Sequence, residues 1–270
     1  MLKLLFLGDI VGRSGREAVA RHLPGLRKSL GLDFVVANGE NAAGGYGITD
    51  KIAAELYATG VDCITTGNHV WDQRELMLTI ERDPKLLRPI NFPKNTPGKG
   101  VGVYKLPNGG QIVVMNAMAR LFMDALDDPF AAVDAALEKH KLGANGTAAI
   151  LIDLHGEASS EKYAFAHFCD RRASLVVGSH SHVPTADAQV LAGGTGYQTD
   201  AGMCGDYDSV IGMKKEPAIQ RFVRKLPGER LTPAEGEGTL CAIYAEIGTN
   251  GLATRVAPVR QGGRLAPALP

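Results

Sequence analysis

Short, largely apolar runs alternate with longer amphipathic stretches in the first third of the chain. Three such runs occur, at residues 3–8, 33–37 and 62–66. Between them, residues 14–30 and 49–59 carry apolar side chains at helical spacing. Each of these stretches starts near a residue that suits a helix N-cap, Ser14 in the first and Thr49 in the second. Strand and helix in this alternation predict βαβ units and a largely parallel sheet.

The middle of the chain has the pattern of a β-hairpin. Two β-rich runs, residues 102–106 and 111–115, flank the sequence Pro107-Asn108-Gly109-Gly110. Asn-Gly between such runs is a strong signal for a tight turn, because both residues tolerate positive φ. We therefore expect an antiparallel pair here, inside an otherwise parallel arrangement.

The second half returns to alternation. The expected helices cover residues 127–141 and 159–172, and the expected strands cover residues 148–154, 175–177, 223–226 and 239–246. The last dozen residues are rich in glycine, proline and arginine, so a loose tail is expected from about residue 259. Because no low-complexity linker interrupts the chain, residues 1–270 are interpreted as a single domain.

Polar side chains follow the ends of five predicted strands. They are Asp9, Glu40, Asn41, Asn68, His69, His155, His180 and His182. The carboxyl ends of parallel strands share one edge, where ligands bind in α/β proteins. These side chains offer oxygen and nitrogen donors without a thiolate, which suits iron, manganese, zinc or magnesium better than a soft metal. A glycine precedes several of them, and we expect it to allow a tight turn that points the next side chain into the site.

The order of these motifs resembles the calcineurin-like metallophosphoesterases. The motifs are Gly8-Asp9, Gly39-Glu40, Gly67-Asn68-His69, Asp153-Leu154-His155 and Gly178-Ser179-His180-Ser181-His182. Several longer stretches look like the YmdB-type branch of that superfamily: residues 8–12, 38–45, 66–71, 200–203 and 207–212. The similarity covers nearly the whole chain. It implies a four-layer α/β/β/α sandwich, with two sheets packed face to face and helices outside.

The resemblance also implies a dinuclear metal centre and assigns its ligands. One metal would be held by Asp9, Glu40, Asn41 and His182. The other would be held by Glu40, Asn68, His155 and His180, with Glu40 bridging the two. His69 would stand beside them as a proton donor. The implied cofactors are two divalent or mixed-valence metal ions, with iron as the first choice and manganese or zinc as alternatives.

Three positions depart from the pattern of the wider superfamily or of the branch. Val11 stands where the superfamily has a histidine, and Glu40 stands where it has an aspartate. Both departures match the YmdB-type branch, in which Asn41 replaces the lost ligand. Cys204 stands where a residue such as threonine is expected in the branch. The affinity and identity of the first metal, and the effect of Cys204, therefore stay open.

The activity implied by the resemblance is hydrolysis of small cyclic nucleotides, either 2′,3′-cyclic or 3′,5′-cyclic monophosphates. Two cations would neutralise the phosphodiester and activate a bridging hydroxide for in-line attack, and His69 would protonate the leaving alkoxide. Two alternatives stay open. One is a phosphomonoesterase or nucleotidase that uses the same metals, and the other is a regulatory metal-binding protein with residual catalysis.

Composition limits the partners and the compartment. Lysine plus arginine and aspartate plus glutamate each number 29, so the formal net charge is zero and binding of long nucleic acid by bulk charge is not expected. The four cysteines form no CxxC pair, and no signal peptide or membrane-spanning run is recognised. We expect a cytoplasmic protein without a membrane partner, and the resemblance makes it a homo-oligomer.

Three further segments carry two interpretations each. Residues 214–230 hold six basic and two acidic side chains, and form either a solvated face or a nucleotide contact. The loop Gly44-Gly45-Tyr46-Gly47 either cradles phosphate or only needs unusual backbone angles. Residues 116–124 form either an ordinary loop or a lid over a base.

Overall fold

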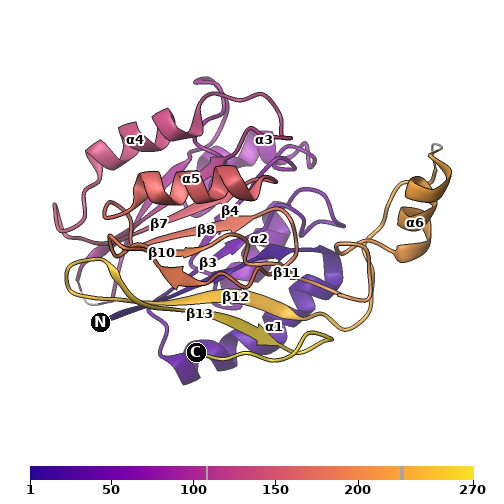
Figure 1. The fold of residues 1–270 in the computed structure, drawn as a ribbon. Coiled ribbons are helices and arrows are strands. Elements are labelled where there is room, and N and C mark those ends of the chain that lie inside the picture. The colour runs from indigo at the N-terminus through magenta and orange to yellow at the C-terminus, as the bar shows by residue number, and fades with distance from the viewer. Residues whose placement is uncertain (108, 226–227) are drawn as a thin grey trace.

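Two sheets form the centre of the protein (Figure 1). The computed structural model describes residues 1–107, 109–225 and 228–270. The first sheet has the strand order β13-β12-β1-β3-β4, with bounds β1 (Leu2–Leu7), β3 (Phe34–Asn38), β4 (Cys63–Thr65), β12 (Leu240–Ile247) and β13 (Ala253–Gln261). The second has the order β5-β6-β7-β8-β10-β9, with bounds β5 (Val101–Lys105), β6 (Gln111–Met118), β7 (Thr147–His155), β8 (Leu175–Ser179), β9 (Gln189–Val190) and β10 (Gly196–Gln198).

A short parallel ribbon and six helices complete the fold of the residues that the structure describes. The ribbon pairs β2 (Asp9–Ile10) with β11 (Met203–Cys204). The helices are α1 (Gly12–Leu30), α2 (Asp50–Ala58), α3 (Leu76–Thr79), α4 (Pro129–Lys139), α5 (Ser159–Cys169) and α6 (Lys215–Arg224), and α3 continues into a 3₁₀ turn at Ile80–Arg82. Among the described residues, none of the helices has both the length and the apolar character needed to cross a bilayer.

Three hydrophobic clusters define the layers. Leu4 and Phe6 of β1 point toward the second sheet and pack with residues of β6, β7 and β8. Leu5 and Leu7 point to the opposite face and pack against α1 and α2, as alternation along a strand requires. On the far side of the second sheet, Phe165 of α5 packs with α4 and with β7. The layer order is therefore helix, sheet, sheet, helix, which is the expected four-layer sandwich.

The expected helix starts are partly right. Thr49 caps α2, because its side chain accepts a hydrogen bond from the Ile52 amide at 3.3 Å. The cap at Ser14 is wrong, since α1 begins at Gly12 and the Ser14 hydroxyl donates instead to the Gly236 carbonyl at 2.7 Å. The first amides of α1 find backbone partners: Gly12 N–H donates to the Asn41 carbonyl at 2.9 Å. A side-chain cap is therefore not needed at this helix.

Two expected features near the C-terminus differ from the structure. Residues 223–225 do not begin a strand: Val223 lies in the last turn of α6, Lys225 is its C-cap, and residue 226 lies outside the described residues. The apolar positions 218, 219, 222 and 223 have helical spacing, which overrides the short apolar run. The tail is not loose from residue 259, because β13 pairs with β12 as far as Gln261. Arg260 and Ala268 then exchange two backbone hydrogen bonds, of 2.9 and 3.0 Å.

The hairpin is present, since β5 and β6 pair antiparallel, although Asn108 of its predicted turn lies outside the described residues. Strands β1, β3 and β4 are parallel in one sheet, and β6, β7, β8 and β10 are parallel in the other. The arrangement outside the hairpin is not wholly parallel, because β12 pairs antiparallel with both β1 and β13, and β9 pairs antiparallel with β10. The carboxyl ends of strands from both sheets thus supply the loops around one site. Helix α6 projects from the body of the protein (Figure 1).

Candidate metal centre

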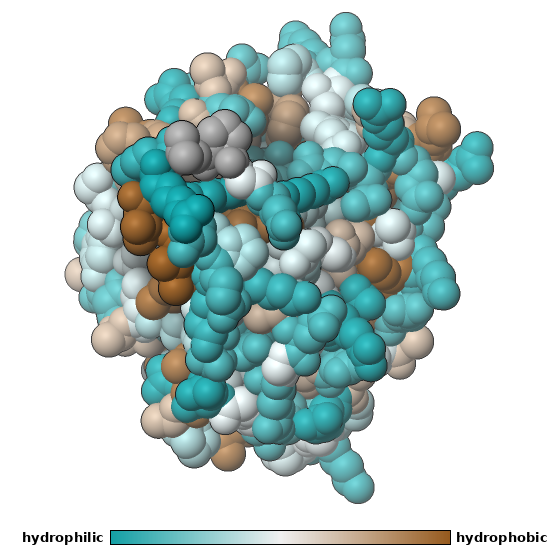
Figure 2. All heavy atoms as spheres, turned by 90° about the vertical axis from the view of Figure 1, so that its right-hand side faces the viewer, coloured by the Kyte–Doolittle hydropathy of each residue, from teal (hydrophilic) through white to brown (hydrophobic). Residues whose placement is uncertain are grey.

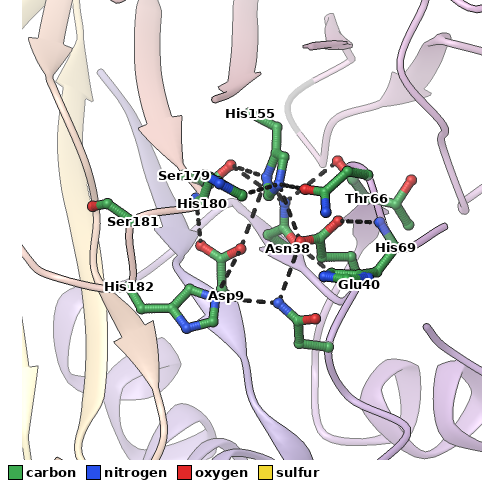
Figure 3. A network of polar contacts seen from close by, with 12 residues as sticks. Asp9, Asn38, Glu40, Thr66, His69, His155, Ser179, His180, Ser181 and His182 are labelled. Carbon is green, nitrogen blue, oxygen red and sulfur yellow. Dashed lines mark hydrogen bonds and ion pairs between the residues drawn. The ribbon is translucent and has the colours of Figure 1, made fainter. Parts of the chain in front are cut away.

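All eight predicted site residues come together at strand ends of both sheets. Figure 3 labels Asp9, Glu40, His69, His155, His180 and His182 among them. Asp9 lies in β2, directly after β1, and His155 is the last residue of β7. The others follow the strand ends: Glu40 and Asn41 after β3, Asn68 and His69 after β4, and His180 and His182 after β8. The predicted residues thus lie close together, as expected. They come from the strand ends of two sheets that face one site, and not from the edge of a single sheet.

One half of the site is centred on the buried imidazole of His155. Its Nε2 lies 3.0 Å from Glu40 Oε1, 3.0 Å from His180 Nδ1 and 2.9 Å from Asn68 Oδ1. One donor atom each from Glu40, His155 and His180 lie within 4.8 Å of one another. This spacing lets the three atoms contact a single cation without rearrangement of the backbone.

The other half consists of Asp9, Asn41 and His182. His182 Nε2 lies 3.2 Å from Asn41 Nδ2 and 3.8 Å from Asp9 Oδ1. Asp9 Oδ1 and Asn41 Oδ1 are buried and have no hydrogen-bond partner in the described part of the chain. Buried acceptors without a donor are costly. Two of them at one site, beside an imidazole, fit a hard cation as their partner.

Electrostatics in the cluster favour positive charge next to Glu40. Burial opposes ionisation of Glu40, but the charge and hydrogen bond of His155 outweigh it and lower the pKa to about 2. Burial likewise opposes a charge on His155, yet Glu40 raises its pKa to about 9. Burial and the neighbouring His155 lower the pKa of His180 to about 3, while burial raises the pKa of Asp9. His180 is therefore neutral and offers a lone pair at neutral pH.

Close packing, and not turn geometry, explains the glycines that precede site residues. Gly67 and Gly178 do not have positive φ. A Cβ at Gly67 would overlap the imidazole of His155, and one at Gly178 would overlap the Thr199 carbonyl oxygen. The positive φ angles belong to His180, at 100°, and His182, at 65°. Both histidines therefore hold strained left-handed conformations, which surrounding contacts must maintain.

A hydroxyl and a carboxylate orient His155 from behind. Ser179 Oγ donates to Asp153 Oδ1 at 2.6 Å and lies 3.0 Å from His155 Nδ1. Because the hydroxyl hydrogen is used on Asp153, Oγ accepts from Nδ1–H, so the proton that His155 would release to bind a metal is the one on Nε2, which faces the site. Burial raises the pKa of Asp153 to about 6. Sequence reasoning missed both roles, although Asp153 stands two residues before His155, on the same face of β7.

A buried ion pair supports the segment that carries His180. Lys162 Nζ donates to Asp200 Oδ2 and to the Ser179 carbonyl, both at 2.8 Å. Asp200 Oδ2 also accepts from the Ser181 amide at 3.0 Å. Asp200 belongs to a motif that the sequence singled out, but Lys162 lies in the middle of α5 and gave no signal. The pair ties the loop after β8 to the helix that covers it.

His69 stands at the edge of the cluster, on the cavity side. Its backbone amide donates to Glu40 Oε2 at 3.0 Å, and its Nδ1 lies 2.8 Å from Asp72 Oδ2. Its ring packs edge-on against Tyr46, with centroids 5.1 Å apart. A cavity of about 620 Å³ opens here, lined by Glu40, Asn41, His69, His180 and His182 together with residues of α6. Asp72 was not among the predicted site residues.

Comparison with known protein families identifies the family of this chain. A family model described as YmdB-like protein matches residues 5–259. The chain belongs to the YmdB-like family.

Relatives of this YmdB-like chain share most of its length. The Bacillus subtilis protein named 2′,3′-cyclic-nucleotide 2′-phosphodiesterase is 46% identical over 246 residues, which are 91% of each chain. A solved structure of a hypothetical protein from Thermus thermophilus is 40% identical, with a TM-score of 0.90, and covers 97% of this chain and 100% of its own. A novel phosphatase from Mycoplasma pneumoniae is 29% identical, with a TM-score of 0.88 and coverages of 97% and 93%.

The departures at Val11 and Cys204 are structural neighbours in this YmdB-like chain. Val11 is buried, and its amide donates to the Cys204 carbonyl at 2.9 Å. Cys204 pairs with Ile10 in the ribbon that carries Asp9. Its thiol is buried and donates to the Cys241 carbonyl at 3.4 Å. Cys204 thus lies beside the strand that carries Asp9 and contacts that strand through its backbone.

The three segments that carried two interpretations each differ in whether they line the cavity. Gly45 and Tyr46 of the glycine-rich loop line the cavity, as do several residues of the basic stretch 214–230, through α6. Residues 116–124 do not line it: their first part belongs to β6, where Asn116 Oδ1 accepts from the Thr66 amide at 3.0 Å. The lining of this cavity therefore gives no support to a lid at residues 116–124, and that interpretation stays a prediction.

Proposed function

We propose that the chain is a metal-dependent phosphodiesterase that hydrolyses small cyclic nucleotides, with 2′,3′-cyclic monophosphates as the first choice and 3′,5′-cyclic monophosphates as the second. The observation that carries the proposal is the convergence of buried carboxylates, imidazole nitrogens and oxygen atoms without hydrogen-bond partners at and beneath the floor of one cavity. The name of the Bacillus subtilis relative supports the 2′,3′-cyclic class.

We assign two metal ions to this site. Asp9, Glu40, Asn41 and His182 would hold one, and Glu40, Asn68, His155 and His180 would hold the other. Glu40 suits the bridging position, because its Oε1 contacts His155 and Asn41 at 3.0 and 3.2 Å. When bound, the ions would neutralise the phosphodiester and supply hydroxide near neutral pH. Nitrogen and oxygen donors favour iron, manganese or zinc, and we propose iron first.

His69 is the proposed proton donor to the leaving alkoxide. A carboxylate oxygen accepts, so the contact of 2.8 Å with Asp72 places a hydrogen on His69 Nδ1. Nε2 is then the ring atom that can deliver a proton to the substrate, and Asp72 holds the ring while it does so. The amide of His69 donates to Glu40, which fixes the distance between the proton donor and the proposed ligands.

The experiment compares His69→Ala and Glu40→Gln with His167→Ala as a matched control, because His167 is an exposed histidine on α5 that does not line the cavity. Metal content and hydrolysis of a cyclic nucleotide are measured for each variant. His69→Ala should keep its metal and lose about 10²- to 10⁴-fold in turnover. Glu40→Gln should lose metal as well, and His167→Ala should change neither. A fully active His69→Ala would remove the proposed proton donor.

A substrate panel tests the substrate class. The protein is reconstituted without oxygen with iron, manganese or zinc and assayed on 2′,3′- and 3′,5′-cyclic nucleotides, bis-nitrophenyl phosphate and nitrophenyl phosphate. The proposal expects the cyclic diesters to be the best substrates. A preference for the monoester would favour a phosphatase, which is how the Mycoplasma pneumoniae relative is described. Turnover no faster than that of metal in buffer would favour a regulatory protein.

A further inference from the structure

The cavity has two chemically different sides. Its floor is polar and contains four of the proposed metal ligands, Glu40, Asn41, His180 and His182. The rest of its lining includes apolar side chains from other segments: Tyr46, Ile211, Met213, Ala218, Phe222 and Leu231. A phosphate group alone would need only the polar floor. The apolar side matches a ligand that carries a phosphate at one end and a flat apolar group at the other.

Helix α6 supplies the most exposed part of this apolar side. All ten of its residues are described, and Ala218 is the only buried one among them. Phe222 and Val223 are each 71% exposed, and of the two only Phe222 lines the cavity. On the face that carries α6, brown apolar side chains gather within a mostly hydrophilic surface (Figure 2). Binding is favoured when the apolar surface of a ligand covers an exposed phenylalanine, because apolar area is then removed from water.

We propose that α6 is the nucleobase-recognition element of this enzyme, and that the base of the substrate stacks on Phe222. This inference rests on the proposed function, because it takes the phosphate to lie at the polar floor. The base is the large apolar part of a cyclic nucleotide, so it belongs on the apolar side. Stacking has no hydrogen-bond code, so the site accepts all four bases and favours purines, which have the larger ring.

Phe222 is a better stacking surface than the other aromatic ring of the cavity. The Arg230 guanidinium lies 5.0 Å from the centroid of the Tyr46 ring, and His69 packs on its edge. The Lys225 ammonium is 6.0 Å from the centroid of the Phe222 ring, at the outer limit of a cation–π contact. Lys225 and Arg221 also line the cavity, so the side that meets the base carries positive charge suited to an anionic ligand.

The test compares Phe222→Ala with Val223→Ala, the equally exposed neighbour that does not line the cavity. Two substrates share the five-membered cyclic diester: adenosine 2′,3′-cyclic phosphate and glycerol 1,2-cyclic phosphate, which has no base. Phe222→Ala should lower kcat/KM for the adenosine substrate about tenfold, through KM, as expected for the loss of one base stack. Its activity on the glycerol substrate should not change. Val223→Ala should leave both unchanged, and Phe222→Trp should restore the adenosine activity.

Binding of adenosine 3′-monophosphate and of glycerol phosphate, measured by calorimetry on the same variants, gives a readout without turnover. If the wild-type protein hydrolyses neither cyclic diester, the first-choice substrate class of the proposed function fails, while a selective loss of adenosine binding in Phe222→Ala still supports the stacking role. Equal effects on both ligands, or no effect on either, overturn that role. Light scattering adds a further outcome: a change of mass in both Phe222→Ala and Val223→Ala would make α6 a contact between copies of the chain and overturn the assignment.

Discussion

The buried pair of Lys162 and Asp200 offers a sharp test of how the fold supports the candidate site. Both side chains are about 1% exposed. The Lys162 ammonium also donates to the Ser179 carbonyl, in the strand end that leads into His180. Replacement by methionine keeps most of the side-chain volume and removes the charge and its donors. Lys162→Met should therefore destabilise the protein and disturb the loop after β8 without opening a large cavity.

The magnitude follows from what the variant leaves unpaired. Removing one partner of a buried ion pair costs about 3–5 kcal/mol. Asp200 keeps two backbone donors, the Ser181 amide at 3.0 Å and the Gly202 amide at 2.9 Å. The cost of leaving Asp200 without Lys162 is therefore expected near the lower end of that range. The Ser179 carbonyl loses a donor, which adds about 1 kcal/mol. We expect Lys162→Met to lower the free energy of unfolding by about 4 kcal/mol.

The assay is equilibrium unfolding in urea of the metal-free protein, followed by metal content at a fixed free-metal concentration. Arg13→Met serves as the control, because Arg13 and Glu17 form an ion pair whose side chains are 77% and 56% exposed. This variant should leave both quantities within error. The double variant of Lys162→Met and Asp200→Asn should recover about 1–3 kcal/mol, since it removes the unpaired charge. A loss in Lys162→Met no larger than in Arg13→Met would refute the reasoning.

Three further outcomes are expected. Gly67→Ala should cost about 1–3 kcal/mol and lower metal content, because its Cβ overlaps the ring of His155; unfolding and metal analysis check this. Asp72→Asn should lower kcat by less than the roughly 10²–10⁴-fold expected for loss of a general acid, with metal content unchanged in the same assay. A thiol reagent should label no cysteine of the native protein and all four after unfolding, because burial raises the pKa of each thiol; they are Cys63, Cys169, Cys204 and Cys241.

Sequence patterns predicted most of the fold because local signals and tertiary packing agree along most of the chain. The strand that ends at His155 and the helix capped by Thr49 lie where their periodicity and capping indicated. The pattern did not show how the strands divide between two sheets. That division depends on strands such as β1, which is apolar on both faces and therefore packs against helices on one side and a second sheet on the other.

The sequence predicted which residues come together at the candidate site. It did not predict the contacts that hold them in place. Glu40 and His180 could be identified from the sequence alone, because each follows the end of a predicted strand. The left-handed backbone at His180 and the tautomer of His155 depend on Ser179 and Lys162, whose partners are distant in sequence. Only the fold brings these groups together, so no spacing rule reveals them.

The two sides of the cavity differ in how firmly the fold holds them, and this difference has a functional consequence. The polar floor is fixed by buried contacts such as Lys162 with Asp200, and by the overlap that forbids a side chain at Gly67. Helix α6 is held less firmly: Ala218 is the one buried residue among its ten, the helix lies outside the three hydrophobic clusters, and its Lys215 reaches Asp208 through a partly exposed ion pair of 2.9 Å. A change at Phe222 therefore has a small cost in stability, whereas a change at the floor also disturbs the core. We expect proteins that share this centre to differ in substrate preference through α6, while the phosphoester chemistry at the floor stays the same.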